Sequence, residues 1–433
     1  MKLISITAAL RSARSREIAL SFGLQVAGAG LGYASQVVLA RVLTAAPYGA
    51  VSATVSLSTI VGLVTTLGTG GLALRYLPQF VSAGDSESRD VFIAFAYRLA
   101  TVASLGTCLL GLGVAVGVMR QPAPVVLAAA ALCVATALWN LGGDIGRAIG
   151  RFAMTYGVGL VARPAIAIAC MVVVSWSGFT RSTTTGLLAL LAGGVFAIAV
   201  QVGVIARGSR FPGLLWKWGG HPRSWIREAP HYLMANGFVL LLLQADMLVS
   251  AYFLPSESLG YYSAASKSVG VLSVVSVAIG TVVVPRIAAS SGDVGALGAE
   301  ARSATRWQMI LVVFASVPLL VFAPEVLSLF GSGFSDAAWA LRILVLGQVV
   351  NMAFGPGGTL LVYTGSPQVA TMGYAVSVVI AALACGVGAN FYGLAGAALG
   401  SAAGVICAGM LQWYLARRYT GVGASIWSSF RQW

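Results

Sequence analysis

Twelve long apolar runs recur along this chain, and they constrain its fold more than any other feature. Most are close to 20 residues long, the length that an α-helix needs to cross the hydrocarbon core of a bilayer. Backbone N–H and C=O groups find no water there, so these runs must form helices that satisfy their own hydrogen bonds. The predicted spans are 18–40, 49–74, 91–118, 123–142, 153–176, 185–206, 231–254, 260–284, 307–322, 337–361, 369–392 and 394–416.

The composition agrees with a membrane protein and excludes a soluble enzyme. Of the 433 residues, 58% are hydrophobic and only 9% are charged, whereas soluble globular proteins carry about 25% charged residues. The five cysteines stand singly in apolar runs, which indicates neither a disulfide framework nor a zinc site. We therefore expect an all-α polytopic membrane protein with about 12 transmembrane helices, no metal site and no cofactor.

The basic residues set the predicted topology. If the N-terminus is cytoplasmic, nineteen of the 26 Lys and Arg residues lie on cytoplasmic segments, three on external loops and four inside spans. The positive-inside rule favours this orientation, so the net charge of +14 is interpreted as a topology signal and not as a nucleic-acid site. The predicted cytoplasmic segments include 1–17, the linker 207–229 and the tail 417–433. The linker tryptophans, interpreted as interfacial anchors, are Trp216, Trp218 and Trp225.

Two weak matches indicate that the chain repeats itself. Segment 48–53 aligns with 259–264 at an offset of 211 residues, and segment 140–143 aligns with 355–358 at an offset of 215. Six predicted spans separate each pair, so the copies keep the same orientation in the membrane. We expect two six-helix lobes, 18–206 and 230–416, related by a pseudo-two-fold axis along the membrane normal, an arrangement typical of secondary transporters.

Glycine and proline interrupt the tenth span, at a position that matches Gly142 and Gly143 at the end of the fourth. Paired interruptions of this kind point to a transport cavity or a hinge. The alternative is that these glycines let helices approach closely, as we expect for Gly396, Gly400 and Gly404 in the last span. The predicted hinge residues are Gly355, Pro356, Gly357 and Gly358.

Four basic residues lie inside predicted spans, where a basic side chain costs about 2.5–3.5 kcal/mol at the helix centre. They are Arg98, Arg163, Lys267 and Arg342. Guanidinium and ammonium groups suit an anionic substrate, so we interpret the four as candidate substrate-binding residues. For Arg98 and Arg342, which lie near span ends, the alternative is that the side chain reaches the interface.

Asp246 is the single acidic residue inside the predicted spans. It lies at a depth similar to that of Lys267 on the next helix, so an ion pair between them is one interpretation. The other is that Asp246 exchanges a proton or a sodium ion during transport. The polar residues Gln201, Gln244, Gln348 and Asn351 could add hydrogen bonds to sugars or join helices to one another.

The sequence resembles the polysaccharide flippase branch of the multidrug/oligosaccharidyl-lipid/polysaccharide exporter superfamily. Segment 40–43 (Ala-Arg-Val-Leu) with Tyr48-Gly49 looks like the first-loop pattern of that family. Segments 246–250 and 259–264, followed by Pro285, look like its pattern in spans seven and eight. The resemblance implies a two-lobed protein of the bacterial inner membrane that moves an undecaprenyl-diphosphate-linked oligosaccharide between leaflets by alternating access. It also implies a cationic cavity, which Arg98, Arg163 and Lys267 could supply.

The resemblance further implies a lipid-linked oligosaccharide as substrate, and a monomer that works with a polysaccharide polymerase and a chain-length regulator. Three alternatives remain. A cation-coupled drug exporter of the same fold would need more acidic residues, and a lipid II flippase usually has fourteen spans. A membrane glycosyltransferase or polymerase would need catalytic acids, and the short external loops hold only Glu257, Glu325 and Asp336.

Overall fold

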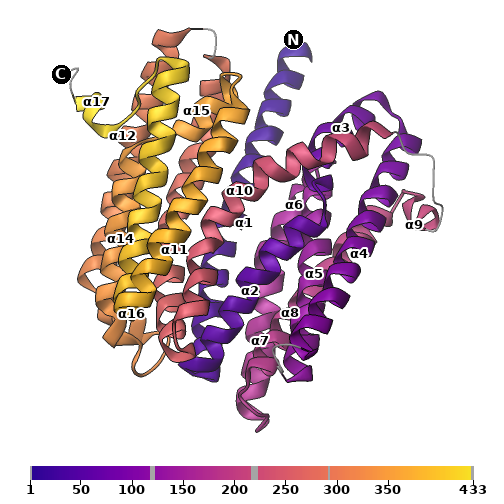
Figure 1. Ribbon diagram of the computed structural model, residues 1–433. Helices are drawn as coiled ribbons and strands as arrows, with labels where there is room; N and C mark the ends of the chain where they lie inside the picture. Colours follow the sequence, from indigo (N-terminus) through magenta and orange to yellow (C-terminus); the bar gives the residue numbers. More distant parts are fainter. Residues whose placement is uncertain (1, 118–121, 216–222, 291–292, 431–433) are drawn as a thin grey trace. The chain divides into compact units, whose positions relative to one another are not determined.

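A computed structural model describes residues 2–117, 122–215, 223–290 and 293–430 of the chain (Figure 1). All regular secondary structure within these ranges is helical, as the apolar runs predict. The first half contains α1 (Lys2–Leu43), α2 (Ala45–Thr65), α3 (Thr69–Ala83), α4 (Ser86–Gly117), α5 (Ala123–Ala148), α6 (Phe152–Tyr156), the π-helix η1 (Gly157–Ala162), α7 (Arg163–Trp176), α8 (Thr183–Ala206) and α9 (Phe211–Leu214).

The second half continues the same pattern. It contains α10 (Arg223–Phe253), α11 (Ser256–Ala289), α12 (Val294–Val321), α13 (Ala323–Ser328), the 3-10 helix η2 (Phe334–Ala337), α14 (Ala338–Ala353), α15 (Gly357–Tyr363), α16 (Pro367–Thr420) and α17 (Ile426–Phe430). Helix covers all or most of each of the twelve predicted spans. In the described part of the chain, ten helical stretches are long and apolar enough to cross a membrane. One of them, α16, consists of two helices joined at a kink.

Helix α16 folds back on itself at Gly393. This glycine has φ 56° and ψ −135°, a backbone conformation that residues with a side chain avoid. The two arms then run antiparallel: Gly396 lies against Gly388, Gly400 against Ala384, and Gly404 against Ala381. A Cβ atom on Gly396 would come within 1.8 Å of the Gly388 carbonyl oxygen. The glycines at four-residue spacing therefore do permit close helix contact, as predicted.

Three predicted spans are broken by local changes of the helix. The second span divides between α2 and α3, where Leu67 and Gly68 take positive φ values. The fifth passes through the π-helix η1 immediately before Arg163. The tenth divides at Phe354–Pro356 between α14 and α15. The fourth does not break, because α5 continues through Gly142 and Gly143 to Ala148.

The helices form two compact units. The N-terminal unit comprises Met1–Ser35, Val61–Thr180 and Leu187–Leu233, and the C-terminal unit comprises Gln36–Ile60, Arg181–Gly186 and Met234–Trp433. In the C-terminal unit, α11, α12, α14 and α16 lie side by side (Figure 1). The six-helix lobes 18–206 and 230–416 stay a prediction.

An aromatic cluster forms part of the core of the N-terminal unit. The Trp225 side chain from the start of α10 is 3% exposed, and its ring lies 4.9 Å from that of Phe92 and 5.6 Å from that of Phe95. Tyr76 and Phe80 of α3 complete the cluster. The prediction that Trp225 anchors the chain at the interface is therefore wrong, because its ring is packed in the core. Trp216 and Trp218 lie outside the described residues.

The repeated segments meet each other within the C-terminal unit. Gly49 at the start of α2 lies against Gly260 at the start of α11: a Cβ atom on Gly49 would be 2.7 Å from the Gly260 nitrogen. A Cβ atom on Gly260 would be 2.1 Å from the Ala45 carbonyl oxygen. Equivalent residues of two copies contact each other where a two-fold axis passes between them. The contact agrees with the alignment of segments 48–53 and 259–264.

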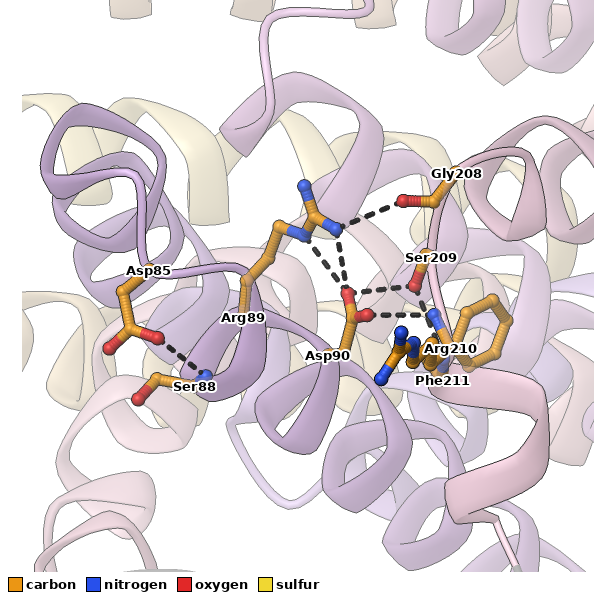
Figure 2. A network of polar contacts seen from close by, with 8 residues as sticks. All are labelled: Asp85, Ser88, Arg89, Asp90, Gly208, Ser209, Arg210 and Phe211. Carbon is orange, nitrogen blue, oxygen red and sulfur yellow. Dashed lines mark hydrogen bonds and ion pairs between the residues drawn. The ribbon is translucent and has the colours of Figure 1, made fainter.

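The third helix of each repeat begins with the same cap. Asp85 accepts a hydrogen bond of 2.9 Å from the backbone N–H of Ser88 at the start of α4 (Figure 2). Asp293 accepts bonds of 2.7 and 3.2 Å from the N–H groups of Gly295 and Ala296 at the start of α12. Aspartate at this position satisfies helix N–H groups that have no partner within the helix. The two halves thus share local detail beyond the matched glycines.

Candidate functional site

A cavity of about 490 Å³ lies within the C-terminal unit, and we call it the C-terminal cavity. Helices α10, α11, α12, α14, α15 and α16 all contribute to its wall. Its size falls in the range of about 300–1,000 Å³ that holds small-molecule ligands. Three features predicted separately from the sequence come together in this wall: Asp246, Lys267 and the segment Gly355–Gly358.

Asp246 joins three helices at the cavity. The Tyr262 hydroxyl of α11 donates a hydrogen bond of 2.7 Å to Oδ2 of Asp246, which lies on α10. The Ser401 hydroxyl, on the second arm of α16, donates to the same oxygen at 3.3 Å. Tyr262 is fully buried, so its hydroxyl is held against the carboxylate by the surrounding core. Anything that binds the Asp246 carboxylate therefore competes with contacts between helices.

Lys267 lines the same cavity without pairing with Asp246. Of the two interpretations of Asp246, the ion pair is not formed among the residues that the structure describes, where four ion pairs occur elsewhere. The carboxylate instead takes its bonds from Tyr262 and Ser401. Both charges line one cavity, but the sequence contained no sign of these two hydroxyl donors. Lys267 thus offers an ammonium group to the cavity.

The predicted hinge forms part of the cavity wall. Gly355 has φ +77°, and α15 starts again at Gly357 after Pro356. Space is also tight: a Cβ atom on Gly357 would lie 2.6 Å from the Gln412 carbonyl oxygen, and one on Gly358 would lie 2.1 Å from the Tyr374 hydroxyl. The structure therefore shows both features at these residues: the helix breaks there, and the glycines let neighbouring helices approach closely. That the break moves stays a prediction.

The remaining polar wall consists of amides and hydroxyls. Among the described residues it carries Gln308, Gln348, Asn351, Gln412, Ser266, Ser273, Ser276, Thr359 and Tyr374 in addition to Ser401. Gln348 and Asn351 were singled out from the sequence, whereas Gln308, Gln412 and Tyr374 were missed. Their signal was present, since each is a polar residue within an apolar run. Gln412 is 5% exposed and its side-chain oxygen has no hydrogen-bond partner among the described residues.

Arg163 lies in the N-terminal unit, where its side chain packs against an aromatic ring and not against a carboxylate. Its guanidinium carbon is 4.0 Å from the ring centroid of Trp139 on α5, a cation–π contact. Its Nε donates to the Gly159 carbonyl oxygen at 3.4 Å. Gly159 and Gly193 flank the pair closely, so side chains at those two positions would not fit without movement. The half-buried cation is held in one place, and its hydrogen bond among the described residues uses one of its five N–H donors.

The other two candidate cations lie elsewhere. Arg98 is buried at 9% exposure in α4 of the N-terminal unit. Arg342 is exposed on α14, and its Nε donates to the Leu320 carbonyl oxygen at 3.0 Å, outside the wall of the C-terminal cavity. The exposed position of Arg342 agrees with the alternative that its side chain reaches the interface. Of the four predicted cations, Lys267 alone lines the C-terminal cavity as the described residues define it.

Gln201 and Gln244, the other two predicted amides, do not line the C-terminal cavity either. Gln201 is fully buried in the N-terminal unit, and neither its side-chain oxygen nor its nitrogen has a partner among the described residues. Gly142 provides the space for it, since a Cβ atom there would lie 2.4 Å from the Gln201 oxygen and 2.8 Å from the Tyr97 hydroxyl. Gly142 of α5 thus allows the Gln201 and Tyr97 side chains to lie close to the α5 backbone.

Solved structures with the same fold cover nearly the whole chain. A multidrug resistance MATE family transporter of the MOP superfamily, in an inward-facing conformation, matches with a TM-score of 0.76 and 14% identity over 93% of this chain and 95% of its own. The lipid II flippase MurJ, in an inward closed conformation, matches with a TM-score of 0.71 and 13% identity over 91% of this chain and 87% of its own. The bent form of the Vibrio cholerae MATE transporter VcmN matches with a TM-score of 0.62 and 16% identity over 95% of this chain and 98% of its own.

These likenesses show the fold. It is the MATE-like fold, as predicted. No curated protein matches the chain in sequence. A family model, described as polysaccharide biosynthesis protein, matches residues 15–291. That match covers more than half of the chain, including segments 48–53 and 259–264, Asp246 and Lys267. The chain is therefore a multi-pass membrane protein that belongs to the polysaccharide biosynthesis protein family.

Proposed function

We propose that the protein is a flippase that moves undecaprenyl-diphosphate-linked oligosaccharide repeat units across the bacterial inner membrane for surface polysaccharide synthesis, whether O-antigen, capsule or exopolysaccharide. The proposal combines the family with one structural observation, the polar chemistry of the C-terminal cavity. Among the described residues, one acid and one base face that cavity, and the rest of its polar lining consists of amides and hydroxyls. Such groups exchange hydrogen bonds with sugar hydroxyls, which act as both donors and acceptors.

The charges suit the diphosphate part of the same lipid. Lys267 offers an ammonium group in the C-terminal cavity, and Arg163 offers a guanidinium group in the N-terminal unit. A guanidinium group can bind two phosphate oxygens at once through two parallel N–H donors, and this binding is stronger where water is excluded. In this proposal Arg98 and Arg342 are the remaining substrate-binding candidates, and alternating access re-exposes the head group outside while the polyprenyl tail stays in lipid.

Cells depleted of the protein test the proposal directly. Their polyprenyl-diphosphate lipids would be identified by mass spectrometry, and the leaflet that holds them would be determined in inverted vesicles. We expect a complete repeat unit to accumulate on the cytoplasmic side. Accumulation of an incomplete sugar chain would instead indicate an enzyme of glycan assembly. If no lipid-linked glycan accumulates, the flippase proposal is wrong.

A matched pair of amide variants tests the role of the cavity. Gln348 lines it, whereas Gln244 lies on α10 outside its wall. We expect Gln348→Ala to lower the flipping rate and Gln244→Ala to leave it nearly unchanged. Both variants must reach the membrane in normal amounts for the comparison to count. Equal flipping rates would remove the C-terminal cavity from the substrate path.

Asp246 is the proposed coupling residue, for a proton or a sodium ion. An ion on its carboxylate competes with the hydroxyls of Tyr262 and Ser401, so ion binding would change contacts among α10, α11 and α16. We expect Asp246→Asn to reduce flipping and to remove its dependence on the pH or sodium gradient. If this variant keeps both the rate and the gradient dependence, the coupling role is lost.

Arg163 can be tested separately from folding. We expect Arg163→Ala to impair flipping far more than it lowers the thermal stability of the purified protein. Arg163→Lys keeps the charge but loses the planar group with its five donors, so its flipping rate should fall between those of the wild type and Arg163→Ala. Normal flipping by Arg163→Ala would remove this residue from the site.

A cation-coupled multidrug exporter is the second candidate, because Asp246 faces the C-terminal cavity and the fold is shared with MATE transporters. Lys267 in the same wall disfavours an organic cation as substrate. Efflux of a fluorescent organic cation from cells that express the protein distinguishes the two. Efflux that disappears in Asp246→Asn, without accumulation of glycan lipids on depletion, would favour the exporter.

A further inference from the structure

A second pocket, of about 160 Å³, lies in the N-terminal unit and shares no described lining residue with the C-terminal cavity. It sits where α4 begins and where α5 and α8 end, so it marks one end of three predicted spans. Three arginines line it, together with four aliphatic side chains. The charged and aliphatic residues of this arginine pocket are Arg89, Arg151, Arg207, Val81, Ile93, Ile149 and Ile205.

Local contacts hold two of the arginines in place. Arg89 donates from Nη2 to the Gly208 carbonyl oxygen at 3.3 Å, and Arg151 donates from Nη1 to the Val204 carbonyl oxygen at 2.8 Å. Each guanidinium carries five N–H groups. The Arg151 bond uses one of them, whereas Arg89 uses up to three when its contacts with Asp90 are included. The Arg207 side chain is exposed beside them. The pocket therefore presents fixed donors that still have capacity.

Among the described residues, Asp90 is the carboxylate that forms an ion pair with one of these arginines. Asp90 is 5% exposed and pairs with Arg89, at 2.9 Å from Nη2 (Figure 2). Its Oδ1 also accepts a bond of 2.8 Å from the Ser209 hydroxyl, and its Oδ2 accepts one of 2.7 Å from the backbone N–H of Arg210 (Figure 2). Asp90 thus fixes the loop after α8 and does not line the pocket. The described lining of the pocket holds three guanidinium groups and no carboxylate, so the pocket is cationic.

We propose that the arginine pocket binds the phosphate group of an anionic phospholipid. Guanidinium groups match phosphate oxygens in geometry and charge. Basic pockets between transmembrane helices on the cytoplasmic side are typical sites for anionic head groups. The predicted topology puts this pocket on that side, because the loops after α5 and α8 belong to the basic cytoplasmic segments.

The aliphatic half of the wall favours a lipid over free phosphate. Val81, Ile93, Ile149 and Ile205 offer nothing to a small hydrated anion, but they suit the glycerol and upper acyl carbons of a phospholipid. A lipid bound there connects the start of α4 with the loops that follow α5 and α8. It would stabilise one end of the N-terminal unit whatever the protein transports, so this inference and the proposed function can fail separately.

Native mass spectrometry of the purified, delipidated full-length protein tests the inference. Bound lipid is counted during titration with phosphatidylglycerol, with phosphatidylcholine of the same acyl chains, or with inorganic phosphate. We expect phosphatidylglycerol to bind at least about tenfold more tightly than phosphatidylcholine. The double variant Arg151→Gln/Arg207→Gln should weaken phosphatidylglycerol binding about tenfold and leave phosphatidylcholine binding unchanged.

Two further variants keep the test decisive. Arg207→Gln alone changes an exposed side chain, so it should fold normally and weaken phosphatidylglycerol binding about fivefold. Arg418→Gln removes the same charge from an exposed position in the last turn of α16, and it should change binding less than about twofold. Equal losses in Arg418→Gln and Arg207→Gln, or equal binding of the two lipids, would overturn the proposal. Millimolar inorganic phosphate that displaces phosphatidylglycerol would show a site for a free anion instead.

Discussion

Matching positions in the two halves of the chain behave differently: α5 runs straight through Gly142 and Gly143, whereas α14 and α15 are separated just before Gly357. Both places are rich in glycine, so glycine alone does not break a membrane helix. The second half adds Pro356, which cannot donate a backbone hydrogen bond, and Gly355 takes a positive φ. In α5 the glycine makes room for Gln201 and Tyr97 and the helix continues.

The difference extends to what surrounds each segment. Around Gly142 the side-chain amide of Gln201 and the hydroxyl of Tyr97 are buried. Neither has a hydrogen-bond partner among the described residues. Around Gly355–Gly358 the polar groups line a cavity of about 490 Å³. The two matching segments thus differ in their surroundings: polar groups are packed without a cavity around Gly142 as far as the described lining shows, whereas they line the C-terminal cavity around Gly355–Gly358. Pairs of equivalent variants can test this comparison.

The largest effect is expected from filling the two close contacts. In Gly357→Ala the new Cβ would meet backbone atoms of Gln412, within 2.6–2.7 Å, and a backbone cannot move aside cheaply. We expect a loss of about 3 kcal/mol of stability for this variant. In Gly142→Ala the neighbours are the side-chain ends of Gln201 and Tyr97, which can shift, so about 1 kcal/mol should be lost. Thermal unfolding of both purified variants in one detergent measures the order, and equal shifts would contradict it.

An intermediate effect is expected from straightening the break. Pro356→Ala restores a backbone N–H and favours a continuous helix. If the break is the predicted hinge, the flipping rate should fall on the order of tenfold while the protein remains folded. The matched control is Gly143→Ala, where the nearest side-chain atom to a new Cβ is 3.8 Å away, so flipping should stay nearly normal. A Pro356→Ala variant that flips normally would reduce the break to a packing feature.

The smallest effect is expected at the shared helix caps. Asp85→Ala and Asp293→Ala each remove one cap, so they should lower Tm by a similar small amount, about 1–2 °C. A large difference between them would show that the two copies of this helix no longer play equivalent roles.

The cap of α4 should also depend on pH. Hydrogen bonds from the hydroxyl and the backbone N–H of Ser88 lower the pKa of Asp85 below its ordinary value. A lowered folded-state pKa stabilises the protein above the unfolded-state pKa of about 3.9, and this stabilisation is lost as pH falls through the folded-state pKa. The Tm difference between the wild type and Asp85→Asn should therefore be present at neutral pH and shrink below about pH 4. A difference that stays constant from pH 7 to pH 3 would contradict this cause.

The sequence predicted the helices because membrane burial imposes a length and an apolar composition on each one. It also predicted that Gly396, Gly400 and Gly404 permit close helix contact, since glycines at four-residue spacing form a smooth face; that the partner is the other arm of α16 came from the structure. The break at Leu67 and Gly68 was missed, because an apolar run looks the same whether its helix is straight or bent. Three threonines mark this place, and their hydroxyls bond back to carbonyl oxygens three or four residues earlier. They are Thr65, Thr66 and Thr69.

The candidate site was predicted in part. Charges inside spans are easy to find, and Asp246 and Lys267 do line the C-terminal cavity. Their partners are harder, because Tyr262 and Ser401 are ordinary residues until the fold brings them to the carboxylate. Trp225 shows the converse error, since an aromatic residue next to basic residues looks like an interfacial anchor in sequence. Only the neighbouring rings of Phe92 and Phe95 show that it belongs to the core.

The contact between Gly49 and Gly260 constrains how the two halves can evolve. Each residue lies against backbone atoms at the start of the second helix of the other repeat, so neither position can acquire a side chain unless both helices separate. Segments away from this contact are free to diverge, as α5 and α14 have done. A duplicated gene whose copies drift apart almost everywhere should therefore retain this glycine pair for the longest time.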